Sequence, residues 1–265
     1  MDKFETIRYE VEEHIATITL ARPDKRNAMN QAMFLELGEA AELANNDTDV
    51  RGVLLIGEGP SFCAGIDLAL LAELGGMGAG STEFGMFIQM AQRPFRLLAT
   101  MGKPTIAVVQ GHALGAGFQL ALACDLRVAS PDARFAILEL QYGIIPDLGG
   151  SHHLARTAGA AVAKELVWAA RTIDAAEAFG LGIVNRLVDD DRRMEEAQNL
   201  MRRVTSHSPI AVSQAKTLIN RAHETPIESQ FEREAIAQAT CLQSEDHREA
   251  VAAFMEQRAP QFKGK

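Results

Sequence analysis

The sequence predicts an α/β fold, a spiral of ββα turns followed by a helical C-terminal segment. Three patterns lead to it: strand-like alternation near the N-terminus, two apolar runs typical of buried parallel strands, and an almost wholly helical pattern from residue 191 onward. With 265 residues and 47% hydrophobic content, the chain is long enough to bury one large core. We therefore expect a core over residues 1–190 and a helical segment over residues 191–265.

The first 20 residues predict a hairpin. Apolar or β-branched side chains occupy every second position over residues 7–11 and again over residues 15–19, and the polar pair Glu12 and Glu13 between them predicts the turn. Residues 30–44 then carry apolar side chains at helical spacing, and the order strand, helix, strand repeats through residue 130. Repeated crossovers of this kind imply stacked ββα turns.

A glycine-rich run, GGMGAG, lies between Leu74 and Ser81. Each glycine carries a large backbone entropy cost in a helix, so the run predicts a mobile loop over residues 75–80. A lid near a binding pocket and a plain surface insertion both remain open as its role.

Beyond residue 191 the pattern predicts helices at residues 192–207, 210–223, 227–240 and 245–257, with Pro209 and Pro226 at two of the boundaries. No strand is predicted among them. Helices that lack a sheet to cover must pack on something else.

Composition excludes several classes of protein. The formal charge is −9, from 26 Lys and Arg against 35 Asp and Glu, and no basic stripe runs along the sequence, so nucleic-acid binding is disfavoured. Cys63, Cys124 and Cys241 lack metal-ligand spacing, which favours a reduced cytoplasmic protein without a metal. The first residues, MDKFET, lack an apolar signal core, and no uncharged apolar run approaches the roughly 20 residues that span a bilayer. We expect no membrane association.

Two motifs indicate chemistry. Residues 62–68 (FCAGIDL) and 111–119 (GHALGAGFQ) follow the two apolar runs at residues 51–56 and 104–109. Glycine allows close backbone approach to a ligand, so together the motifs can aim two backbone N–H groups at one developing oxyanion. A glycine-rich turn that serves packing is the plainer alternative for the second motif. A phosphate-binding loop is set aside, because no Lys-Ser or Lys-Thr pair follows and no dinucleotide fingerprint is present.

These motifs resemble those of the crotonase superfamily, the enoyl-CoA hydratase/isomerase family. Residues 21–29 (ARPDKRNAM), 144–150 (IIPDLGG) and the last helix and tail at 247–265 are similar as well, so the resemblance covers nearly the whole chain. It implies a crotonase-like core with an acyl-CoA thioester as substrate and no separate cofactor. It also implies that the C-terminal helices build a trimer or hexamer and close the neighbouring active site.

The resemblance places the oxyanion donors at the backbone of Ile66 and Ala116, the latter where relatives often carry glycine. Hydration in this family resembles a two-glutamate mechanism, but here Gln119 occupies the first glutamate position and Glu139 the second. A neutral amide cannot serve as a general base, although it can polarise a water or hold the substrate. Asp147 stands where dienoyl-CoA isomerases of the family carry a catalytic aspartate.

Structural roles remain open for both acids. Glu139 could only cap or pair at a short helix start, although a carboxyl among apolar residues costs energy unless it is paired or functional. Asp147 could be the N-cap of the helix that follows it.

The resemblance also implies contacts to coenzyme A. Lys25 and Arg26 are candidates for its phosphates, with a solvated charged turn as the alternative. Residues expected along the adenine, pantetheine and acyl path are Ala28, Ala64, Gly65, Asp67, Leu68 and Gly115.

The absence of the first glutamate favours isomerisation of a double bond in an unsaturated acyl-CoA. Glu139, with Asp147, would move a proton between two carbons of the acyl chain, with an enolate as the intermediate. Three alternatives remain: hydration of 2-enoyl-CoA, acyl-CoA binding without catalysis, and a role in the degradation of ring-derived acids, since an aspartate after Ile-Pro also resembles ring-acid isomerases of the family.

Overall fold

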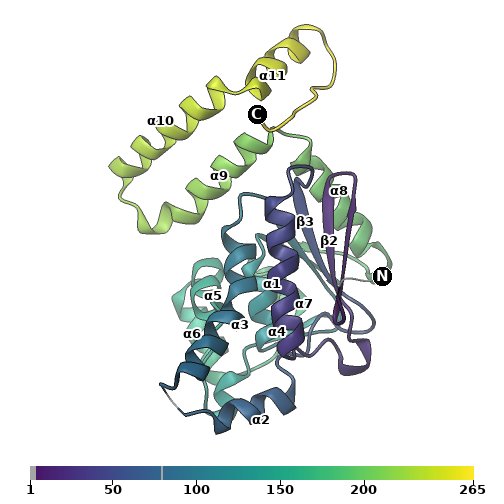
Figure 1. The fold of residues 1–265 in the computed structure, drawn as a ribbon, viewed down its shortest axis with the longest axis vertical. Helices are drawn as coiled ribbons and strands as arrows, with labels where there is room; N and C mark the ends of the chain where they lie inside the picture. The colour runs from purple at the N-terminus through teal and green to yellow at the C-terminus, as the bar shows by residue number, and fades with distance from the viewer. Residues whose placement is uncertain (1–3, 79) are drawn as a thin grey trace.

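The structure, a computed structural model, describes residues 4–78 and 80–265. Within this part of the chain a six-stranded sheet runs in the order β1-β2-β3-β4-β6-β9 and a three-stranded sheet in the order β5-β7-β8 (Figure 1). The strands span Ile7–Glu12 (β1), Ile15–Leu20 (β2), Gly52–Gly57 (β3), Thr105–Val109 (β4), His112–Leu114 (β5), Leu126–Ala129 (β6), Arg134–Ala136 (β7), Ile173–Asp174 (β8) and Arg186–Leu187 (β9).

The helices cover these sheets and extend beyond them. They span Gln31–Asn46 (α1), Leu68–Gly76 (α2), Thr82–Thr100 (α3), Ala116–Ala123 (α4), Gly150–Ala158 (α5), Ala160–Ala169 (α6), Ala175–Gly180 (α7), Arg193–Thr205 (α8), Pro209–Arg221 (α9), Ile227–Gln243 (α10) and Glu245–Met255 (α11). The predicted α/β fold with a helical C-terminal segment is confirmed.

The N-terminal hairpin is present, with its turn one residue later than predicted. Strands β1 and β2 pair antiparallel from Ile7 with Leu20 to Glu12 with Ile15. Glu13 and His14 make the turn with φ angles of 47° and 66°. Two successive positive φ angles are typical of the two-residue turns whose twist matches a hairpin. Glu12 therefore belongs to the strand and not to the turn.

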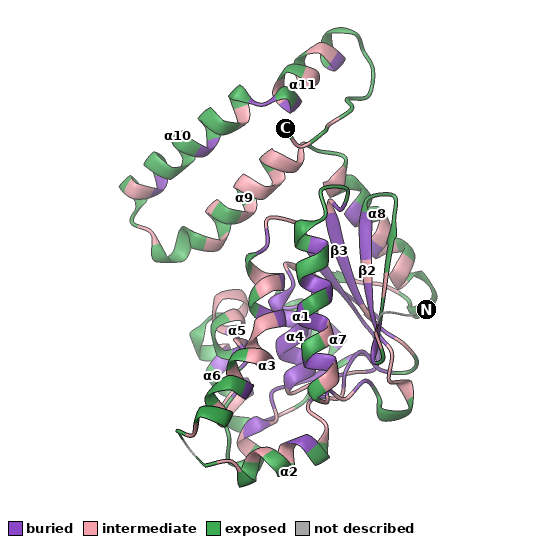
Figure 2. Ribbon diagram, viewed as in Figure 1, coloured by how far each residue is buried: buried purple, intermediate pink, exposed green. Residues whose placement is uncertain are grey.

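The central strands are parallel and buried on both faces. β2, β3, β4 and β6 pair in parallel, and β3 and β4 match the predicted runs to within one residue. Val53 and Leu55 of β3 belong to the main core, whereas Leu54 belongs to a second cluster with Ala197 and Met201 of α8. Burial on both faces explains why these strands appear as continuous apolar runs in the sequence. Figure 2 shows β2 and β3 as buried, with exposed faces of α1 and α8 outside them.

The C-terminal helices are confirmed, but they do not form one unit. α8 packs on β3, β4 and β6 and so covers the sheet. The helices that leave the body of the molecule are α9 to α11, which we call the arm (Figure 1). The proposed division at residue 190 and the role of residues 191–265 in self-association stay predictions.

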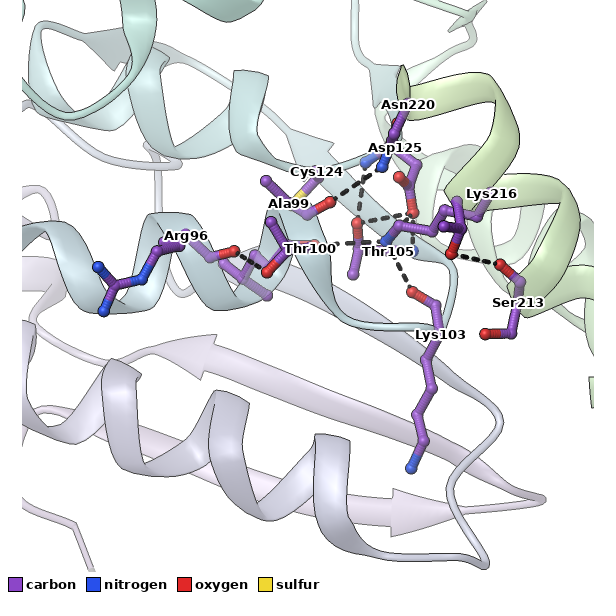
Figure 3. A network of polar contacts seen from close by, with 12 residues as sticks. Arg96, Ala99, Thr100, Lys103, Thr105, Cys124, Asp125, Ser213, Lys216 and Asn220 are labelled. Carbon is purple, nitrogen blue, oxygen red and sulfur yellow. Dashed lines mark hydrogen bonds and ion pairs between the residues drawn. The ribbon is translucent and has the colours of Figure 1, made fainter. Parts of the chain in front are cut away.

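A polar network fastens the arm at its base (Figure 3). Lys216 of α9 donates to Asp125 Oδ2 and to the carbonyl oxygen of Lys103, each at 2.8 Å. Asn220 donates to the carbonyl oxygen of Ala99 at 3.2 Å. These contacts hold α9 to the end of α3 and to the start of β6.

The glycine-rich run forms less of a loop than the sequence predicts. Gly75 and Gly76 complete the last turn of α2, and the N–H of Met77 donates to the carbonyl oxygen of Leu74. A glycine costs about 1 kcal/mol in a helix interior, but an exposed terminal turn tolerates it. The next helix begins at Thr82 with Ser81 as its N-cap. Of the predicted loop, Ala79 lies outside the described residues.

Candidate active site

The two sequence motifs lie side by side because β3 and β4 are adjacent parallel strands whose carboxyl ends meet at one edge of the sheet. The N–H of Cys63 donates to the carbonyl oxygen of His112 at 2.8 Å, and the N–H of Leu114 returns a bond to Cys63 at 3.0 Å. A Cβ on Gly65 would lie 2.9 Å from the Leu114 carbonyl oxygen, and one on Gly117 would lie 2.3 Å from the Cys63 carbonyl oxygen. Glycine is therefore required where these backbones approach.

Two backbone N–H groups are left over where the loops meet. Met29 forms a parallel bridge with Ile66 through the carbonyl oxygen of Gly65 and the N–H of Asp67, so the N–H of Ile66 points to the other side. Ala116 is the first residue of α4, where an N–H has no acceptor within the helix. Among the described residues no hydrogen bond ends at either N–H. Ala116 has a helical backbone with negative φ, so its Cβ causes no strain.

A cavity of about 480 Å³ opens at this place. Most of the predicted site residues line it, namely Lys25, Ala28, Ala64, Gly65, Ile66, Asp67, Leu68, Gly115, Ala116 and Glu139. Apolar side chains that sequence analysis did not single out complete the wall, namely Leu71, Leu114, Leu138, Tyr142 and Ile144. Tyr142 and Ile144 lie between the predicted acids Glu139 and Asp147 in the sequence, and this position could have identified them as lining residues.

Glu139 is the first residue of the 3-10 helix Glu139–Tyr142 and is 8% exposed. Its Oε1 accepts from Gln119 Nε2 at 2.6 Å, while Oε2 has no hydrogen-bond partner among the described residues. Burial raises the pKa of this carboxyl, and the nearby charge of Asp147 adds to the rise, while the bond from Gln119 opposes it. No ion pair of Glu139 occurs in the described part of the chain, so pairing does not explain its burial.

Gln119 lies in α4, is 1% exposed and does not line the cavity. Its Oε1 accepts from the backbone N–H groups of Leu148 and Gly150, each at 3.0 Å. Because both of these partners are donors, the amide oxygen must face them, and the NH₂ group must face Glu139. Sequence analysis expected this amide to face water or substrate, whereas protein groups occupy both of its ends.

Asp147 lies in the loop that Gln119 holds. Its side chain is exposed and does not line the cavity, yet the surrounding protein removes enough water to raise the pKa of the carboxyl. Its carbonyl oxygen accepts from Gln92 of α3 at 2.7 Å. The alternative that Asp147 caps the next helix is wrong, because α5 begins at Gly150 with Gly149 as its N-cap.

The motif at residues 62–68 supplies a second carboxylate, Asp67, and both of its oxygens accept hydrogen bonds. Asp67 accepts from the N–H of Ala69 as N-cap of α2 and forms an ion pair with Arg22 at 3.1 Å. The Ala69 N–H, together with Arg22, lowers the pKa of Asp67. Sequence analysis missed Arg22, because its partner lies 45 residues further along the chain.

The two predicted phosphate contacts differ in position. Lys25 is exposed at the rim of the cavity, in the 3-10 helix Pro23–Lys25. Arg26 is also exposed but does not line the cavity; its carbonyl oxygen accepts from the N–H of Ala64 at 2.9 Å. Arg26 thus contacts the motif at residues 62–68 through its backbone and not through its guanidinium.

Comparisons with known proteins decide the family. The family model described as "Enoyl-CoA hydratase/isomerase" matches residues 10–265. The chain belongs to this family. Relatives include crotonyl-CoA hydratase of Syntrophomonas wolfei, 37% identical over 98% of both chains, and 2,3-dehydroadipyl-CoA hydratase of Escherichia coli, 34% identical over 96% of this chain and 97% of that one. The crystal structure of an enoyl-CoA hydratase from Bacillus anthracis superposes with a TM-score of 0.91 at 31% identity, covering 98% of this chain and all of that chain.

The crotonase-like fold is therefore confirmed, and the protein is an enzyme of the crotonase type. In the described part of this enoyl-CoA hydratase/isomerase family member, no group of three His, Cys, Asp or Glu residues could hold a metal ion. No helix among residues 4–78 and 80–265 is long and apolar enough to cross a membrane.

Proposed function

We propose that the protein moves a double bond within an enoyl-CoA thioester, with Glu139 as the proton carrier. One observation carries this proposal: of the two carboxylates that line the cavity, Asp67 is paired with Arg22, while Oε2 of Glu139 has no hydrogen-bond partner among the described residues. Burial raises the pKa of Glu139 and so brings it closer to neutral pH. A general base works best when its pKa lies near the pH of the reaction.

In the proposed reaction Oε2 of Glu139 takes a proton from Cα of a 3-enoyl thioester. The electrons of that C–H bond form the dienolate, and the thioester oxygen carries the negative charge between the N–H groups of Ile66 and Ala116. The same carboxyl then returns its proton to Cγ while the double bond shifts to the Cα–Cβ position. Neither water nor an oxidant is consumed. Donors of this kind are each worth about 100- to 1,000-fold in rate.

Asp147 is the second proposed acid. Its charge adds to the rise in the pKa of Glu139, so ionisation of Asp147 favours the protonated form of Glu139. Lys25 at the rim is the proposed contact for a coenzyme A phosphate, and the neighbouring backbone of Ala64 and Gly65 the proposed path for its pantetheine chain.

Hydration is the second candidate, because relatives at 37% and 34% identity are named hydratases. Gln119 argues against it, since the amide cannot take a proton from water and is already bound to protein groups at both ends.

The surface of the arm supports the proposal that the chain assembles into a trimer or hexamer. Its helices α10 and α11 expose large apolar side chains, namely Ile227, Phe231, Ile236, Leu242, Val251, Phe254 and Met255. An exposed apolar surface of this extent is typical of an interface between proteins.

The deciding experiment incubates the protein with 2-enoyl-, 3-enoyl- and 3,5-dienoyl-CoA in deuterated water. A shifted double bond with deuterium in the acyl chain establishes isomerisation. A 3-hydroxy product instead establishes hydration, and binding without exchange establishes a non-catalytic acyl-CoA binder.

A further inference from the structure

The amide of Gln119 connects two segments that carry the two acids. Through Nε2 it donates to Glu139 at 2.6 Å, and through Oε1 it accepts from the backbone N–H groups of Leu148 and Gly150, which lie one and three residues after Asp147. A Cβ on Gly150 would lie 2.6 Å from Gln119 Cγ, so the amide is closely enclosed. The position of the Gln119 side chain therefore depends on these contacts with other protein groups.

The neutral amide makes the same contacts that a protonated glutamic acid would make at this position. An acid O–H would donate to Glu139, and the other oxygen would accept from Leu148 and Gly150. An ionised glutamate could not donate, and two carboxylates at this separation would repel unless they shared a proton. Gln119 thus keeps a donor facing Glu139 at every pH.

We propose that Gln119 is a positioning residue that holds Glu139 by Oε1 and leaves Oε2 as the single oxygen that exchanges a proton with the substrate. The inference rests on the proposed role of Glu139 as proton carrier. It assigns to Gln119 no contact with substrate; the residue acts through the orientation and the ionisation of Glu139.

Three variants test this role: Gln119→Leu, Gln119→Glu and the control Gln110→Leu. Gln110 is also a buried glutamine, but its Nε2 donates to the carbonyl oxygens of Gly57 and Gly59, away from Glu139. The readouts are kcat and KM for exchange of substrate protons, their pH profiles, and the titration of Glu139 followed by NMR of ¹³Cδ-labelled glutamate, with Glu139→Gln to assign the signal.

Gln119→Leu should lower kcat by about 10- to 100-fold with KM nearly unchanged, as expected for loss of one hydrogen bond to a charged group. It should also raise the pKa of Glu139, because the lost donor stabilised the carboxylate. Gln119→Glu should retain activity where the pair holds one proton and lose it at higher pH, through an added ionisation. Gln110→Leu should leave the titration of Glu139 unchanged.

A wild-type titration of Glu139 and a wild-type pH profile in Gln119→Leu would overturn the inference. A fall in kcat in Gln110→Leu with the same shifted profile would do so too, since the effect would then be structural. If Glu139→Gln itself keeps full exchange activity, the proposed function fails instead, and the NMR titration still reports whether Gln119 controls the ionisation of Glu139.

Discussion

Arg22 lies 3.1 Å from Asp67 and neutralises it, although the two residues are far apart in the sequence. The pair occupies one of the two carboxylates that line the cavity and leaves Glu139 for the proposed proton transfer. The proposed chemistry therefore depends on an ion pair that does not include the proposed proton carrier.

Glu139→Gln should abolish exchange of substrate protons while acyl-CoA binding remains, since the amide keeps the shape of the side chain but cannot accept a proton. Asp67→Asn is the matched control, because it alters the other carboxylate of the same cavity. It should keep the N-cap of α2, since an asparagine oxygen accepts the same N–H, lose the ion pair with Arg22, and retain proton exchange. Deuterium incorporation measured by mass spectrometry separates the two results, and full exchange in Glu139→Gln would contradict the assignment.

Ala116→Pro should lower kcat by about 100- to 1,000-fold, because proline removes the N–H of one proposed oxyanion donor. Proline is tolerated at the first position of a helix, where Ala116 lies, so α4 should persist. Ala116→Gly keeps the N–H and should change kcat little. Circular dichroism and steady-state kinetics check both variants; equal losses in the two would argue against an oxyanion role.

Glu139 should lower the stability of the folded chain as the pH rises. Its pKa is raised above the ordinary 4.5 in the folded chain. Its contribution to stability is therefore complete below the unfolded pKa and is lost as pH rises through the folded pKa. Glu139→Gln lacks this titration, so its stability relative to the wild type should increase from acidic to neutral pH. Urea unfolding of both proteins between pH 4 and pH 8 measures the difference, and a constant difference would contradict it.

Lys216→Met should destabilise the protein by about 1–3 kcal/mol, because it leaves the partly buried Asp125 without its cation. The exposed Lys164→Met is the control and should have little effect. A double-mutant cycle with Asp125→Asn should show a coupling between Lys216 and Asp125. Additive losses in that cycle would show that the ion pair does not fasten the arm.

Phe231→Glu should dissociate the proposed trimer or hexamer, because it puts a charge on the apolar surface of α10, where Phe231 is 64% exposed. Phe179→Glu changes a phenylalanine that is 50% exposed on α7, outside the arm, and should leave the assembly intact. Light scattering of each variant gives its mass against the 28.7 kDa chain. A wild-type protein that is monomeric at all concentrations would exclude the assembly.

The sequence alone determined the elements and the place of the site, because their causes are local. Alternation over residues 7–11 and 15–19 identified the hairpin, and apolar spacing with Pro209 and Pro226 identified the C-terminal helices. The two glycine motifs marked the edge of the sheet where the cavity lies, since each follows a buried strand.

Only the tertiary structure decided what each polar group does. Hydrogen-bond partners of Gln119 lie 20 to 31 residues away, and nothing local distinguishes an amide that faces substrate from one bound to Glu139 and Gly150. The same holds for Arg22 with Asp67 and for α8, whose place on the sheet depends on the open face that β3 presents. Periodicity and capping depend on neighbouring residues, whereas a buried polar group takes whichever partner the folded chain brings within reach.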